Sequence, residues 1–135
     1  MIRIDVANAF NTASRSMIRN LLRVADPDVV QFFRTMYLSH AKLAIFGQSE
    51  TAFIDFVEGV RQGDAFSGYF FCILMDAVIA DFKERRREGS TTLMSYMDDL
   101  TITCNPEHTA DVVAAAIAAL EKFGFHVNLG KCGVI

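Results

Sequence analysis

The sequence has no excess of basic residues. Its 135 residues contain 13 Lys and Arg against 16 Asp and Glu, which gives a formal net charge of −3. A free-standing nucleic-acid-binding protein normally neutralises phosphate with clustered Lys and Arg. If the chain acts on nucleic acid, most of the binding contacts are therefore expected to come from outside this chain. Three arginines, Arg85 to Arg87, end the one run of mixed charge; they could touch phosphate, although a solvated helix end also explains them.

Paired cysteines and long hydrophobic runs are lacking as well. Cys72, Cys104 and Cys132 are widely spaced, which argues against a zinc site or a disulfide framework and favours a reducing, intracellular compartment. The longest apolar stretch, residues 69–75, stops at Asp76 and is too short to span a membrane. No signal peptide is visible. We expect a soluble chain without a membrane partner.

Repeats, low-complexity tracts and linkers are also absent. The length suits one hydrophobic core, and 52% hydrophobic residues is on the rich side for a globular protein. Composition therefore predicts a single domain over residues 1–135.

Hydrophobic periodicity and turn residues predict an alternation of strands and helices. Helices are expected over 14–24, with Ser14 as the cap, over 26–39, over 67–87 ending before Gly89, and over 105–124. Strands are expected over 1–6, 42–47, 51–57, 91–95, 100–104 and 125–128. This order predicts an α+β fold of the ferredoxin-like type, an antiparallel sheet backed by helices on one face.

The most informative stretch is Tyr-Met-Asp-Asp at residues 96–99, which reads as a turn between two strands. Two like charges side by side are unfavourable unless a cation lies in front of them, and divalent ions prefer carboxylate oxygen. A solvated Asp-rich turn is the alternative, because Asp is a common turn former. A third acid, Asp5, ends the first strand. If that strand neighbours the turn, at a spacing of about 4.8 Å, the acids could share metal ions.

Four segments then carry a family resemblance in their sequence order. They are residues 5–11 (Asp-Val-Ala-Asn-Ala-Phe-Asn), 59–64 (Gly-Val-Arg-Gln-Gly-Asp), 96–99, and 124–128 (Gly-Phe-His-Val-Asn) followed by Lys131. Together they resemble the successive palm motifs of reverse transcriptases and cover nearly the whole chain. The second and fourth segments look most like the non-LTR retrotransposon and group II intron branch.

The resemblance implies a two-metal site for RNA-directed DNA synthesis. Asp5 and Asp98 would be the principal ligands of two Mg²⁺ ions, for which Mn²⁺ could substitute. The Val6 carbonyl would add an oxygen, and Asp99 ranks third because successive strand residues face opposite sides of a sheet. The metals would activate the primer 3′ hydroxyl and neutralise the triphosphate.

The resemblance also assigns nucleotide contacts, each with a simpler alternative. Phe10 would lie under the sugar and exclude a 2′ hydroxyl, or it is a core residue. Gln62 and Gly63 would lie beneath the templating pair, or they form a plain turn before a helix. Lys131 would protonate pyrophosphate, or it is a solvated lysine.

Some positions depart from the family pattern. Many relatives have proline where this chain has Ala65 and Gly68, which predicts a more flexible turn, and Asn11 stands where relatives often have a second Asp. The basic fingers segment and the thumb are not recognisable. We therefore expect a palm subdomain whose partners are an RNA or DNA template with primer, deoxynucleoside triphosphates and the remaining polymerase subdomains.

Three functions remain open at this point. The first is the palm of a reverse transcriptase, a nucleotidyltransferase with little activity alone. The second is a degenerate fragment without catalysis. The third is another palm-type enzyme, such as a nucleotidyl cyclase, that uses the same acids without a template.

Overall fold

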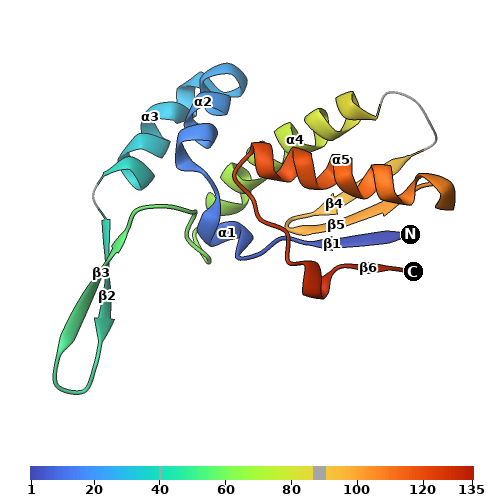
Figure 1. Cartoon of the computed structure of the whole chain (residues 1–135). Coiled ribbons are helices and arrows are strands. Elements are labelled where there is room, and N and C mark those ends of the chain that lie inside the picture. The colour runs from blue at the N-terminus through green and yellow to red at the C-terminus, as the bar shows by residue number, and fades with distance from the viewer. Residues whose placement is uncertain (40, 87–90) are drawn as a thin grey trace.

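The computed structural model describes residues 1–39, 41–86 and 91–135, and at its centre is a four-stranded antiparallel sheet (Figure 1). The strands lie in the order β4-β5-β1-β6. They are β1 (Ile2–Asp5), β4 (Thr92–Tyr96), β5 (Asp99–Thr103) and β6 (Gly133–Val134). Because β1 lies between β5 and β6, its acidic end lies beside the turn that joins β4 to β5.

The two faces of this sheet differ in polarity. Ile4 of β1 pairs with Leu100 of β5, and both side chains are buried. The next pair along the ladder is Asp5 with Asp99. Since successive strand residues point to opposite faces, this alternation turns both carboxylates to the face away from the core.

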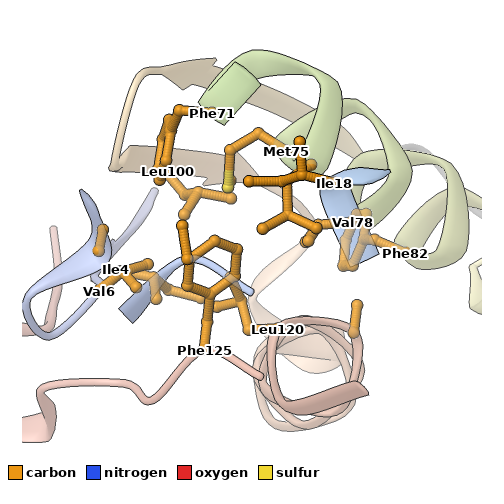
Figure 2. Packing of buried hydrophobic residues seen from close by; sticks show 14 of the residues in the cluster. Ile4, Val6, Ile18, Phe71, Met75, Val78, Phe82, Leu100, Leu120 and Phe125 are labelled. Carbon is orange, nitrogen blue, oxygen red and sulfur yellow. The ribbon is translucent and has the colours of Figure 1, made fainter. Parts of the chain in front are cut away.

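Two long helices, α4 (Ser67–Arg85) and α5 (Thr109–Lys122), cover the apolar face (Figure 1). Figure 2 shows side chains from these helices packed with those of the sheet. A fully buried aliphatic or aromatic side chain contributes about 1.5–3 kcal/mol, so this layer supplies much of the core. The expected antiparallel sheet backed by helices on one face is confirmed. The residues labelled in Figure 2 are Ile4, Val6, Ile18, Phe71, Met75, Val78, Phe82, Leu100, Leu120 and Phe125.

An ionic cluster also joins the two long helices. The nearly buried carboxylate of Asp81 in α4 accepts hydrogen bonds from Lys122 of α5 and from Arg85, one turn further along α4. These two bonds, that of Lys122 first, lower the pKa of Asp81. The carboxylate therefore stays ionised in the folded protein.

A third helix, α2 (Arg15–Ala25), lies against α4. Its cap is the one expected, because the Ser14 hydroxyl accepts a hydrogen bond from the Met17 N–H at 3.4 Å. Ile18 and Leu22 on its inner side are fully buried. The helix predicted over 14–24 is confirmed.

A β-hairpin extends away from this body (Figure 1). It consists of β2 (Ala41–Phe46) and β3 (Thr51–Phe56), close to the two strands predicted. Large side chains on it are exposed, with Phe46 at 82% and Phe53 at 65%. The hairpin therefore draws little burial from the rest of the described chain.

The helix predicted over 26–39 is present as one continuous helical segment over residues 27–38, but it is not α-helical throughout. Its consecutive parts are a 3-10 turn η1 (Pro27–Val29), a single turn α3 (Val30–Phe33) and a π-helical turn η2 (Arg34–Leu38). The expected side-chain cap is not formed, because the Asp26 carboxylate accepts the Tyr69 hydroxyl at 2.7 Å instead of a helix N–H group. A tertiary contact thus replaces the local cap at the start of the segment.

The predicted strand over 125–128 is also wrong. Val127 makes an isolated bridge to Val6, and the chain then forms a 3-10 turn η4 (Leu129–Lys131) before it pairs as β6. The turn interrupts the ladder and moves the strand toward the C-terminus. A short helix α1 (Ala9–Thr12), not predicted, follows β1.

The remaining boundaries agree closely with the expectations. A 3-10 turn η3 (Pro106–His108) opens the helix predicted over 105–124. Helix α4 ends at Arg85, and Arg87 and Gly89, where the prediction ended it, lie outside the described residues. Among the described helices none has the length and apolar character needed to cross a membrane.

Candidate active site

One cavity, of about 330 Å³, brings together most of the side chains singled out in the sequence. It opens at the end of β1, between the loop after that strand, the 59–64 loop, the β4–β5 turn and η4. Gly63 and Asp99 are outside its lining. The six predicted residues that line it are Asp5, Val6, Phe10, Gln62, Asp98 and Lys131. A larger cavity, about 590 Å³, contains none of the predicted residues, so the smaller one is the candidate site.

The two principal acids reach the cavity from different strands. Asp5 is the last residue of β1, and Asp98 is the second residue of the two-residue turn that follows Tyr96. Met97, the first residue of that turn, has a left-handed φ of 54°. The Ser95 hydroxyl supports the turn by donating to the Met97 carbonyl at 3.1 Å. The turn thus carries Asp98 to the end of β1.

Backbone strain is concentrated in the two acid-bearing motifs. In the described chain the non-glycine residues with positive φ are Asn8, at 48°, and Met97. Asn8 lines the cavity and lies three residues after Asp5. Such conformations cost about 1–3 kcal/mol each and are frequent at functional sites. Their location agrees with a site that the rest of the fold holds in place.

Asp99 has a different environment from Asp98. It pairs in register with Asp5 on β1, but its carboxylate accepts a hydrogen bond from the Arg3 guanidinium at 3.3 Å. Both side chains of this ion pair are more than half exposed. Asp99 is therefore partnered by a cation, and neither residue of this ion pair lines the cavity.

The cavity can offer oxygen ligands to a metal ion. Among the residues that the structure describes, no three His, Cys, Asp or Glu side chains form a cluster able to hold a metal. The lining does contain the carboxylates of Asp5 and Asp98 together with Val6. Mg²⁺ is usually bound by one or two carboxylates plus substrate phosphate oxygens, and this donor set fits that mode of binding.

Lys131 reaches the cavity because the C-terminal segment folds onto the main chain of Asp5. The Asn128 N–H donates to the Asp5 carbonyl at 2.9 Å, and the Asp5 N–H donates to the Cys132 sulfur at 3.4 Å. The Cys132 thiol in turn donates to the Asn128 carbonyl at 3.3 Å. Turn η4 lies between these anchors, so Lys131 and Asp5 line the same cavity.

Phe10 has one side in the core and one side at the cavity. Its ring stacks on Phe71 of α4, with centroids 4.3 Å apart and planes 11° from parallel, and the residue is half-buried. It also lines the cavity. The two roles considered for Phe10, core residue and cavity wall, are both compatible with this position.

The loop that carries Gln62 is fitted closely against α1. The Val60 N–H donates to the Phe10 carbonyl at 2.7 Å, and Gly59 has a φ of 72°. A Cβ at Gly59 would lie 2.7 Å from the Asn11 Cα and closer still to its carbonyl group. Gly63 has a φ of 83° and open space beside it in the described structure. Gly59 is thus required by close packing, and Gly63 by its turn conformation.

The sequence reasoning missed Arg15, which anchors the base of this loop. Arg15 is 7% exposed, and its guanidinium donates to the carbonyls of Gly59 (2.7 Å), Tyr37 (2.8 Å), Phe56 (2.9 Å) and Glu58 (3.0 Å). It also lies 4.3 Å from the Phe56 ring centroid. Its position in the helix was an available signal. Arg15 lies three residues before Ile18 and seven before Leu22, both buried, so helical periodicity places it on the buried side of α2.

The family comparison agrees with this site. The family model described as reverse transcriptase (RNA-dependent DNA polymerase) matches residues 1–135. The chain belongs to the reverse transcriptase family. None of the curated proteins searched matches the sequence.

Solved telomerase structures resemble the fold. Apo telomerase from Candida tropicalis matches with a TM-score of 0.77 and 16% identity over 99% of this chain and 28% of the telomerase chain. A form of that telomerase truncated from its C-terminal domain gives 0.73 and 21% over 99% and 30%. Telomerase from Candida albicans, in complex with a fragment of telomeric RNA, gives 0.63 and 15% over 99% and 27%. At these identities the likeness shows the fold alone, and the chain spans less than a third of each of these chains.

Proposed function

We propose that residues 1–135 form the catalytic palm of an RNA-directed DNA polymerase. The observation that supports this most directly is the single cavity lined by Asp5, Asp98, Phe10, Gln62 and Lys131, residues from four segments far apart in the sequence. Membership of the reverse transcriptase family supports the class of reaction.

The two acids and the Val6 carbonyl are proposed to hold two Mg²⁺ ions, for which Mn²⁺ can substitute. When bound, the ions supply Lewis-acid activation of the primer hydroxyl and charge neutralisation of the triphosphate. Asp5 and Asp98 would bind the ions through carboxylates that lie at the end of a strand and in a tight turn. Asp99 is proposed as an auxiliary ligand that would first have to leave Arg3.

The other cavity residues are proposed to handle the nucleotide. Phe10 lines the cavity with a ring that stacks on Phe71, which would restrict the sugar face of the site. Gln62 offers both a donor and an acceptor next to the templating base, and the positive φ of Gly63 lets its main chain turn there. Lys131 carries a proton that it can give to the leaving pyrophosphate.

Within the family, we propose the non-LTR retrotransposon and group II intron branch. The Gln-Gly-Asp loop at 62–64 and the Gly-Phe-His-Val-Asn segment at 124–128 support this assignment. The expected partners are a primer on an RNA or DNA template, deoxynucleoside triphosphates and the remaining polymerase subdomains. We also propose an intracellular location, because the three cysteines are widely spaced in the sequence.

The test is primer extension by this chain joined to the fingers and thumb segments of a related reverse transcriptase. Asp98→Asn keeps the size of the side chain and removes its charge, so we expect a loss of incorporation on the order of a thousandfold. Asp76→Asn, on the exposed side of α4, is the matched control and should leave incorporation unchanged. Full incorporation by Asp98→Asn would reject the proposal.

Product analysis separates the other candidate activity. Free triphosphate with Mg²⁺ and no primer should give no cyclic nucleotide if the chain is a templated polymerase. Cyclic nucleotide formed without a primer, and lost in Asp98→Asn, would favour a cyclase that uses the same acids.

A further inference from the structure

Both ends of the turn that carries Gln62 are bonded to one short segment elsewhere in the fold. The turn spans residues 61–64 and is closed by a hydrogen bond from the Asp64 N–H to the Arg61 carbonyl at 3.3 Å. Gly63 has the positive φ that a type II turn requires at its third residue. The Arg61 guanidinium donates to the Met36 carbonyl at 3.3 Å, and the Tyr37 hydroxyl donates to the Asp64 carboxylate at 2.9 Å. Two adjacent residues of η2 thus hold the two corners of the turn.

Tyr37 is well suited to be a fixed anchor. It is 1% exposed, and its ring lies between Phe33, at a centroid distance of 5.2 Å, and Phe70, at 5.5 Å. Burial, and then the hydrogen bond to Asp64, raises the pKa of Tyr37 to about 12. Its hydroxyl therefore keeps its proton and remains a donor at neutral pH. Its backbone is part of a π-helical turn, a geometry that is frequent at functional sites.

Asp64 connects Tyr37 to the start of α4. One carboxylate oxygen accepts the Tyr37 hydroxyl, and the other accepts the Phe66 N–H at 2.8 Å. Its carbonyl accepts the Ser67 hydroxyl at 2.8 Å, where α4 begins. The turn, the start of α4 and η2 are therefore joined at a single residue, while Gln62 itself remains exposed and lines the cavity.

We propose that Tyr37 is a positioning residue: through Asp64, its hydroxyl holds the 61–64 turn in the conformation that presents Gln62 to the cavity. Tyr37 lines no part of that cavity and acts on it only through the turn. The consequence of the Tyr37–Asp64 hydrogen bond for nucleotide selection rests on the proposed polymerase function, whereas the effect of this bond on the turn does not.

The test compares two tyrosines that each donate to a carboxylate. Tyr37→Phe removes the hydroxyl and keeps the ring in the core. Tyr69→Phe is the matched control, because the Tyr69 hydroxyl donates to Asp26 at 2.7 Å on an exposed part of α4. Amide hydrogen exchange in the 135-residue chain should become about tenfold faster at Asp64 and Phe66, whose N–H groups are hydrogen-bonded in and beside the turn, in Tyr37→Phe, and stay unchanged there in Tyr69→Phe.

Two outcomes would overturn the proposal. The first is exchange at the Asp64 and Phe66 amides of Tyr37→Phe that matches the wild type. The second is exchange that becomes faster by the same factor in β1 and β5, because the hydroxyl would then support only the whole fold.

Primer extension then tests the functional consequence in the same joined polymerase described above. Tyr37→Phe should raise the KM for the templated nucleotide severalfold and change kcat little, while Tyr69→Phe changes neither. If the wild type makes no product, the proposed function fails, and the exchange experiment still decides the role of Tyr37. If the wild type is active and Tyr37→Phe leaves KM unchanged, the inference fails while the proposed function stands.

Discussion

Replacement of Arg15 by methionine should be the most damaging single change outside the cavity. Methionine fills a similar volume but donates no hydrogen bond, so the carbonyls of Tyr37, Phe56, Glu58 and Gly59 would lose their shared donor. A hydrogen bond from a charged group contributes about 1.5–3 kcal/mol, and the carbonyls left behind cost further free energy where water does not reach them. Because a cavity of about 590 Å³ adjoins the guanidinium, water can replace part of this loss, and the separate terms do not add.

We therefore expect Arg15→Met to lower the free energy of unfolding by about 3–5 kcal/mol. That is a large part of the 5–15 kcal/mol typical of a domain. Arg15→Lys should recover only part of the lost free energy, because one ammonium group cannot donate to four carbonyls as the planar guanidinium does. Arg23→Met, in the exposed last turn of the same helix, should change stability by less than about 0.5 kcal/mol.

Urea unfolding followed by circular dichroism measures these differences as shifts of the midpoint at constant slope. A loss below about 1 kcal/mol for Arg15→Met, at unchanged slope, would refute the reasoning that this guanidinium holds the loop base together. A loss as large in Arg23→Met would show that any charge removed from the helix has the same effect.

Three further changes have defined outcomes. Gly59→Ala should destabilise the chain by several kcal/mol in thermal unfolding, because its Cβ would overlap the main chain of α1, whereas Gly63→Ala should cost only about 1 kcal/mol. Hydrogen bonds lower the pKa of Asp81 below 3.8, so the stabilisation by its carboxylate is present above about pH 4 and is lost as the pH falls through the lowered pKa. The loss of stability caused by Asp81→Asn should therefore become smaller in acid. A loss that stays constant from pH 7 to pH 2 would contradict this. Phe10→Val should increase ribonucleotide incorporation by the joined polymerase, and an unchanged ratio of ribonucleotide to deoxynucleotide would place Phe10 in the core alone.

Features with a local cause were predictable from the sequence. The Ser14 cap, the two hairpins and the long apolar helix each depend on residues within one or two turns of chain, and the structure confirms them.

Features that depend on distant partners were not predictable in the same way. The segment after Asp26 reads as a regular α-helix, but it contains 3-10 and π-helical turns, and its residues Met36 and Tyr37 are bonded to the distant 61–64 turn. The C-terminal strand is only two residues long and pairs after a turn that is fixed by Cys132 against β1. Arg15 serves carbonyls 22 to 44 residues away in sequence, which no local pattern encodes.

The central claim is that Asp5 and Asp98 hold the same divalent ions, and Mn²⁺ titration followed by paramagnetic broadening of amide NMR signals tests it most directly. The account predicts broadening that begins around Asp5, Asp98 and Lys131, remains in Asp76→Asn and disappears in Asp98→Asn. Broadening that begins elsewhere, or that persists unchanged in Asp98→Asn, would contradict a shared metal site at this cavity.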